Sequence, residues 1–458
     1  MKATAGLARN LHRKGRHESV GPVRDRRIAW IVAGSLAAGL GAAMLLPFLP
    51  VARVEGDFST AMVLFGFALG WALMALLTTR FTTQPQRWAA LPAVFMLLSG
   101  VLVLWTPDAQ LVALGWVWPP ALLAVVIWAW TRARHELRSR TRAWLLNPVL
   151  VILVLLVVGG AYEAVGRATA PAVAMHGRLV DVGRYRLHLE CTGSSSPTVI
   201  LEPGGGGSAA SMGLITPAVA RTSRVCVYDR AGRGWSDAAA LPPDGAQIAT
   251  DLHTLLGRAH VPGPYVLAGH SFGGLYVRAY AAMYPAEVAG LVLVDSTGVT
   301  SSRVAPRQAD SYSVVKHAAS LIATTSRFGV GRALAAADFS YLSPRYRDDA
   351  RATAATGKEM GGFLDEFGVA NRSEAEAGRL HGFGGKPLIV LTATLGNSPG
   401  WMVAQDASVT LSTNSLHRVE PGAKHASFVD DPVHAAAVTR AIHDVVDAVS
   451  TGRPLQGP

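Results

Sequence analysis

The sequence predicts two regions of different fold class: an all-α membrane region of about five helices, followed by an α/β domain with a mostly parallel, eight-stranded sheet. Residues 28–165 contain five uncharged apolar stretches, each close to the ~20 residues that a helix needs to cross the core of a bilayer. From residue 178 onward, short β-rich runs alternate with helical stretches. Such alternation is typical of a parallel sheet covered by helices on both faces.

The apolar stretches share the features of membrane spans. Nine of the 11 tryptophans lie in this part of the chain, several at stretch ends, where aromatic belts meet the membrane surface. Pro119 and Pro120 fall near the middle of the fourth stretch and must kink or break it. The five stretches are 28–50, 59–79, 88–107, 109–131 and 143–162.

The net charge of +11 belongs almost wholly to the membrane region, because residues 1–170 carry 17 Lys/Arg against 7 Asp/Glu. The basic residues gather in the arm 1–27 and in the loops after the second and fourth stretches. Positive loops stay in the cytoplasm, so the arm is expected inside and, after an odd number of spans, the domain 171–458 outside the cytoplasm. We therefore expect a multi-pass cell-membrane protein with the lipid bilayer as a partner. The near-neutral domain gives no support for a nucleic-acid partner.

The α/β domain contains eight predicted strands. A helix is predicted at 245–259, another after residue 271, and a last amphipathic helix at 432–449. The predicted strands are 178–183, 185–191, 198–202, 224–229, 265–270, 290–295, 387–393 and 416–420.

Four motifs follow one another along this domain, and their order is more specific than any one of them: "YDRAGRGWSD" after the fourth strand, "GHSFGG" after the fifth, "LVLVD" at the sixth and "GAKHASFVDDP" near the end. With these motifs, residues 178–449 resemble the α/β-hydrolase fold family, in particular its serine esterases. The resemblance implies a Ser–His–acid triad without cofactor or metal, and a cap inserted at about 296–385. It also implies that "DRAGRGWSD" is a structural turn in which Asp229 and Arg230 pair locally.

Ser271 is the predicted nucleophile, although the pattern G-x-S-x-G occurs twice, around Ser271 and around Ser398. In a nucleophile elbow the backbone N–H after the serine forms part of the oxyanion hole. Pro399 follows Ser398 and has no N–H, whereas Phe272 follows Ser271 and can donate. Ser271 also ends a strongly β-prone run and opens a helix, as an elbow requires.

His425 is the predicted general base, because it lies between the last strand and the last helix, where the family places that residue. The acid has two candidates. The stretch after the seventh predicted strand lacks a carboxylate until Asp406, which lies on a predicted helix, whereas Asp295 ends the sixth strand beside the serine. We favour Asp295, as in some family members, with Asp406 as the alternative.

Two further features follow from the resemblance. "EPGGGG" at 202–207 follows the third strand, where the family places the other half of the oxyanion hole, so the amides of Gly205 and Phe272 are the predicted donors. The family strand order also makes Cys191 and Cys226 neighbours, and a disulfide is permitted in an extracytoplasmic compartment.

The expected activity is hydrolysis of carboxylic esters through an acyl-enzyme, with a small-molecule or lipid acyl substrate. Two alternatives stay open. The first is an acyltransferase in which a lipid or cell-envelope alcohol replaces water. The second is a non-catalytic membrane receptor with a hydrolase-like domain.

Overall fold

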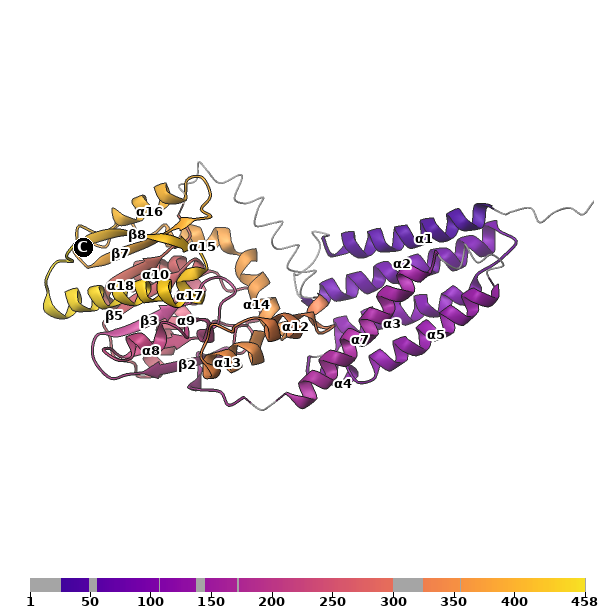
Figure 1. Cartoon of the computed structure of the whole chain (residues 1–458), viewed down its shortest axis with the longest axis horizontal. Helices are drawn as coiled ribbons and strands as arrows, with labels where there is room; N and C mark the ends of the chain where they lie inside the picture. Colours follow the sequence, from indigo (N-terminus) through magenta and orange to yellow (C-terminus); the bar gives the residue numbers. More distant parts are fainter. Residues whose placement is uncertain are drawn as a thin grey trace, which may run out of the picture.

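The computed structural model describes residues 26–48, 56–106, 108–136, 145–170, 173–299, 324–354 and 356–457. Most of the predicted basic arm, the basic loop 138–142 and the first part of the predicted cap lie outside these residues. Figure 1 shows a bundle of helices and an α/β domain placed end to end along the long axis, with the helices of the cap between them.

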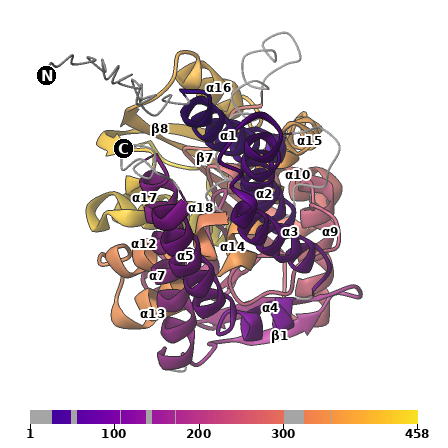
Figure 2. The same cartoon turned by 90° about the vertical axis from the view of Figure 1, so that its right-hand side faces the viewer.

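Four described helices are long and apolar enough to cross a membrane: 27–45, 58–81, 87–105 and 147–169. Seen end-on in Figure 2, α5 and α7 lie beside each other, while α1, α2 and α3 form a second group. The bundle consists of α1 (Arg26–Leu45), α2 (Gly56–Phe81), α3 (Ala90–Trp105), α4 (Asp108–Leu114), α5 (Trp118–Glu136) and α7 (Asn147–Thr169).

The fourth predicted span, 109–131, is not a single helix. The chain turns after Leu114, and α5 begins again at Trp118, so that Pro119 and Pro120 lie in its first turn. A proline is tolerated there because the first turn needs no internal N–H donor. The α5 helix extends to Glu136 and includes Arg132 and Arg134, which keeps it out of the set of four apolar spans.

Small residues bring α1 and α2 into close contact. A Cβ atom on Gly39 would lie 2.6 Å from Cα of Gly70, and one on Gly66 would lie 2.4 Å from Cα of Ala43. Such small-residue contacts are a common way for helices to associate in lipid. The pairing 39 with 70 and 43 with 66 also makes the two helices antiparallel.

The sheet has the order β1-β2-β4-β3-β5-β6-β7-β8, and only β2 runs in the direction opposite to the other strands. This confirms the predicted α/β-hydrolase architecture. The strands are β1 (Arg178–Asp181), β2 (Arg186–Thr192), β3 (Thr198–Glu202), β4 (Val225–Tyr228), β5 (Tyr265–His270), β6 (Val288–Val294), β7 (Leu388–Leu395) and β8 (Ser415–Lys424).

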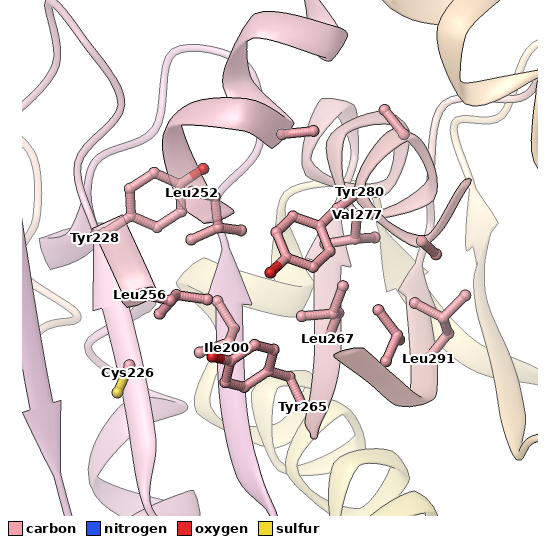
Figure 3. Packing of buried hydrophobic residues seen from close by; sticks show 14 of the residues in the cluster. Ile200, Cys226, Tyr228, Leu252, Leu256, Tyr265, Leu267, Val277, Tyr280 and Leu291 are labelled. Carbon is pink, nitrogen blue, oxygen red and sulfur yellow. The ribbon is translucent and has the colours of Figure 1, made fainter. Parts of the chain in front are cut away.

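The strands β3 to β7 are buried on both faces over most of their length, because successive side chains point to opposite sides of the sheet and helices cover both sides. Ile200 packs in the core under α9 (Gly245–Arg258) and α10 (Phe272–Met283), as Figure 3 shows, together with Leu252 and Val277. Val199 and Leu201 point to the opposite core, which α8 (Thr216–Val219) and α18 (Pro432–Thr451) cover. The central strands are therefore continuous apolar runs.

The described part of the cap lies between β6 and β7 in the sequence. Its helices are α12 (Val330–Ala337), α13 (Pro344–Ala354), α14 (Gly357–Gly368) and α15 (Ala370–Ala377). Figure 1 places α12, α13 and α14 on the side of the sheet that faces the bundle. The cap therefore contacts both the helical bundle and the α/β domain.

Cys191 and Cys226 face each other in the register of β2 and β4 and form a disulfide. The bond joins an antiparallel outer strand to the parallel core. Cys226 is fully buried, whereas Cys191 is exposed.

Replacing both cysteines by alanine should lower the free energy of unfolding by about 3–4 kcal/mol, because the bond closes a loop of 35 residues in the unfolded chain. Thermal unfolding beside the wild type measures the loss. The single variant Cys191→Ala is the control and should lose most of the same stability. Peptide mapping under non-reducing conditions that finds two free thiols in the wild type would contradict the pairing.

Candidate active site

Ser271 lies on the sharp turn between β5 and α10. Its φ of 54° is in a region that side chains rarely adopt, so the turn is strained. Glycine makes the turn possible, because a Cβ on Gly269 would lie 2.4 Å from the carbonyl oxygen of Gly273, and one on Gly273 would lie 2.3 Å from that of Glu202. The turn holds the serine at the carboxyl edge of the sheet.

Ser271, His425 and Asp295 form a continuous chain of hydrogen bonds. Nε2 of His425 lies 2.9 Å from Oγ of Ser271, and Nδ1 of His425 lies 2.7 Å from Oδ2 of Asp295. In this order an imidazole can take the serine proton while the carboxylate orients the ring and stabilises its charged form. The His425 side chain is 42% exposed, so the chain of hydrogen bonds is open to solvent.

Asp295 is fully buried and has three donors around its carboxylate. The indole Nε1–H of Trp401 and the backbone N–H of Ala393 donate to Oδ1 at 2.8 and 3.1 Å, while His425 occupies Oδ2. Burial alone would raise the pKa of the Asp295 carboxyl, but the hydrogen bonds from His425, Trp401 and Ala393 outweigh it and hold the pKa below its usual value. Asp295 therefore stays ionised.

The sequence did not predict that Trp401 is part of this site. Its ring also meets the His425 ring edge-on, with centroids 5.7 Å apart. The only available signal was its place at the start of α16 (Trp401–Val409), shortly after β7, where the family commonly carries the acid. A tryptophan there gives no sign by itself that it reaches back to Asp295.

His270, the residue before Ser271, is buried and lies next to His425. Its Nε2 is 3.0 Å from the backbone oxygen of His425, and the two rings are 4.8 Å apart. Burial, and then the neighbouring His425, lower the pKa of His270 to about 4. A neutral His270 can donate to that carbonyl and so holds the loop carrying His425.

The other candidates lie apart from this chain of hydrogen bonds. Asp406 interacts with His417, with its Oδ1 atom 2.8 Å from Nδ1, and does not reach His425. Ser398 lies in the turn before α16, where its carbonyl accepts from the N–H of Trp401. Of the two acids considered from the sequence, Asp295 is the one that the structure brings to His425.

The glycine-rich loop after β3 packs directly on the serine turn. A Cβ on Gly204 would lie 3.2 Å from Cβ of Ser271, and one on Gly205 would lie 2.9 Å from the ring of Phe272. Only glycine permits such close contact at these positions. The two predicted oxyanion donors, Gly205 and Phe272, therefore lie side by side next to Ser271.

A carboxylate from the cap holds the next residue of this loop. Oε2 of Glu366, on α14, accepts from the backbone N–H of Gly206 at 2.8 Å, and Oε1 accepts from Nε of Arg230 at 2.7 Å. Arg230 also donates to Glu202 at 2.6 Å and to the carbonyl oxygens of Pro203 and Gly204. The loop is thus fixed on both sides.

The predicted local pair of Asp229 and Arg230 is wrong. Asp229 bonds to Nδ1 of His188 at 2.8 Å and accepts from the backbone N–H groups of Ala209 and Trp235. Arg230 turns the other way, toward Glu202 and Glu366. The sequence could not show this, because Glu366 is 136 residues downstream on the cap.

Among the described residues, no group of three or more His, Cys, Asp or Glu side chains is placed to hold a metal ion.

Glu366→Gln should lower the melting temperature, because it removes one of the two carboxylates paired with the buried guanidinium of Arg230. Breaking one partner of a buried ion pair typically costs about 3–5 kcal/mol. The matched control is Arg186→Gln, which breaks the exposed pair of Arg186 and Asp237 and should change the melting temperature little. Equal melting temperatures for Glu366→Gln and wild type would contradict the role of the buried network.

Comparisons with known proteins show partial similarity to two uncharacterised proteins. The chain is 30% identical over 250 residues to an uncharacterised protein of Schizosaccharomyces pombe, covering 46% of this chain and 44% of the relative. It is 29% identical over 136 residues to an uncharacterised vacuolar membrane protein of Saccharomyces cerevisiae, covering 26% and 21%. The chain thus spans less than half the length of these curated relatives.

Two solved structures are similar to part of the chain. Cfl2 from Burkholderia cenocepacia has 22% identity and a TM-score of 0.49, covering 59% of this chain and 95% of its own. A putative lipase from Acinetobacter baumannii has 18% identity and a TM-score of 0.48, covering 64% and 98%. The family model described as the alpha/beta hydrolase fold matches residues 197–432, more than half of the chain. The protein belongs to the α/β-hydrolase family.

Proposed function

We propose that the protein is a membrane-anchored serine hydrolase that cleaves carboxylic esters. The observation that carries the proposal is the chain of hydrogen bonds from Ser271 through His425 to Asp295 at the edge of an α/β-hydrolase sheet. It favours catalysis over a receptor role, because a receptor has no need of a base 2.9 Å from an accessible serine hydroxyl.

In the proposed reaction, Oγ of Ser271 attacks the ester carbonyl as Nε2 of His425 takes its proton. The negative charge on the carbonyl oxygen would be held by the amides of Gly205 and Phe272. His425 then gives the proton to the departing alcohol, leaving an acyl group on Ser271. A water molecule, deprotonated by His425, releases the acid and restores the serine.

The placement of the α/β domain outside the cytoplasm is part of the proposal. The starts of α2 and α5 lie near the cap, since Thr60 bonds to Thr324 and Trp118 meets Phe328. The basic ends of these two helices, carrying Arg80 and Arg134, therefore lie at the far end of the bundle. Positive charge at that end favours its cytoplasmic location.

Ser271→Ala should abolish labelling by a fluorophosphonate probe and lower ester hydrolysis by three or more orders of magnitude, because the nucleophile is lost. The measurement uses the full chain in detergent, with in-gel fluorescence and turnover of a soluble ester. Ser398→Ala, which alters the second G-x-S-x-G pattern, is the control and should label as the wild type does. Undiminished labelling of Ser271→Ala would refute the assignment.

Trp401→Phe should lower the free energy of unfolding at pH 7 by about 1.5 kcal/mol. The variant keeps an aromatic ring but removes one donor to a buried carboxylate. Losing this donor raises the pKa of Asp295, so the difference from the wild type is present while the carboxylate is ionised and shrinks as the pH falls through that pKa. Equal free energies of unfolding for the variant and the wild type at pH 7 would show that the indole N–H does not stabilise the Asp295 carboxylate.

A further inference from the structure

The cap reaches into the helical bundle. A Cβ on Gly159, in α7, would lie 2.4 Å from the carbonyl oxygen of Phe328, and the Phe328 ring lies 5.6 Å from that of Trp118. Gly159 is ten residues before the end of α7 at Thr169, about 15 Å along the helix axis. In a bilayer crossed by α7, this part of the cap lies below the membrane surface.

An ion pair joins the cap to the same helix. Nε of Arg332, on α12, lies 3.0 Å from Oε2 of Glu163, which is also paired with Arg167 at 2.6 Å. The Glu163 side chain is only 6% exposed. A carboxylate inside a membrane span is costly unless it is paired, so Arg332 makes the cap part of the membrane region.

The exposed surface of α12 is apolar. Its sequence is VGRALAAA, and its one charged residue, Arg332, is bound to Glu163. On α12, Val330 is 40% exposed and Leu334 is 60% exposed. On α7, Val158 and Tyr162, which lie on either side of Gly159 in the sequence, are also exposed. A short helix with such a surface, docked on a membrane span, is suited to contact with lipid.

Three aromatic side chains, Phe363, Phe367 and Phe272, form a continuous wall from the cap helix α14 to the turn that carries Ser271. Phe363, on α14, packs over Gly206, where a Cβ would lie 2.5 Å from its ring. The Phe363 and Phe367 rings are 4.6 Å apart, and Phe367 lies 4.8 Å from Phe272, the residue after Ser271. This wall offers apolar contacts to a hydrocarbon chain beside the nucleophile.

We infer that the site takes its substrate from the bilayer, namely a long-chain lipid ester in the leaflet on the side of the α/β domain. The acyl chain contacts Phe363 and Phe367 while α12 sits among the lipids. The reaction is that of the proposed function, on which this inference rests: the ester bond breaks, water supplies the hydroxyl, and a fatty acid and an alcohol leave. The cap is then the point of entry from the membrane.

The test uses the full chain in phosphatidylcholine vesicles and two esters of 4-methylumbelliferone, the soluble butyrate and the bilayer-embedded oleate. Wild type should hydrolyse the oleate with at least about tenfold higher kcat/KM, because the longer chain buries more methylene groups. Leu334→Glu should lower oleate turnover about tenfold and leave butyrate turnover unchanged, because the acid lifts α12 from the lipid.

Met283→Glu is the matched control. Met283 is 40% exposed and ends α10, on the edge of the sheet opposite Ser271, so neither rate should change. Oleate turnover no faster than butyrate turnover, or an equal loss of both in Leu334→Glu, would overturn the membrane route while leaving ester hydrolysis intact. If neither ester is hydrolysed and the serine does not label, the proposed function itself falls, and the inference with it.

Discussion

The buried guanidinium of Arg230 is the interaction on which the arrangement of the site depends. It is 1% exposed, and its donors reach two carboxylates and the carbonyl oxygens of Pro203, Gly204 and, at 3.5 Å, Gly207. A buried ion pair adds little net stability, because desolvation offsets the attraction. The contribution of Arg230 is to geometry. Because all the N–H groups of its planar guanidinium are hydrogen-bonded, the side chain fixes the positions of the end of β3, the glycine loop and the cap helix α14 relative to one another.

The sheet in turn holds two residues in strained conformations. Ser271 and Asp295 both have positive φ, 54° and 41°. Hydrogen bonds that continue the parallel ladder beyond the strand ends hold them there: the N–H of Ser271 donates to Val294, and that of Asp295 donates to Leu391. Such strain persists only where the surroundings over-determine it. The same neighbouring strands therefore set the distance between nucleophile and acid.

The features that could be predicted are those that depend on local sequence patterns or on the resemblance to the family. The strands, the serine turn and the disulfide partners follow from apolar runs, flanking glycines and family strand order. The break expected in the stretch 109–131 lies just before Pro119, which is accepted in the first turn of a new helix. Trp401 and Glu366 were missed because each reaches its partner across about a hundred residues or more. Such contacts depend on how α16 and the cap fold back, which no local pattern records.

The cap also explains why the bundle has more helices than tethering needs. One part of the cap is seated on α7 through Phe328 and Arg332, and another holds the glycine loop through Glu366. A single anchoring helix offers one surface, whereas the first contact involves the starts of α2 and α5 as well as α7. The cap is therefore bound to both the bundle and the α/β domain: Phe328 and α12 lie against α7, and α14 holds the glycine loop beside Ser271.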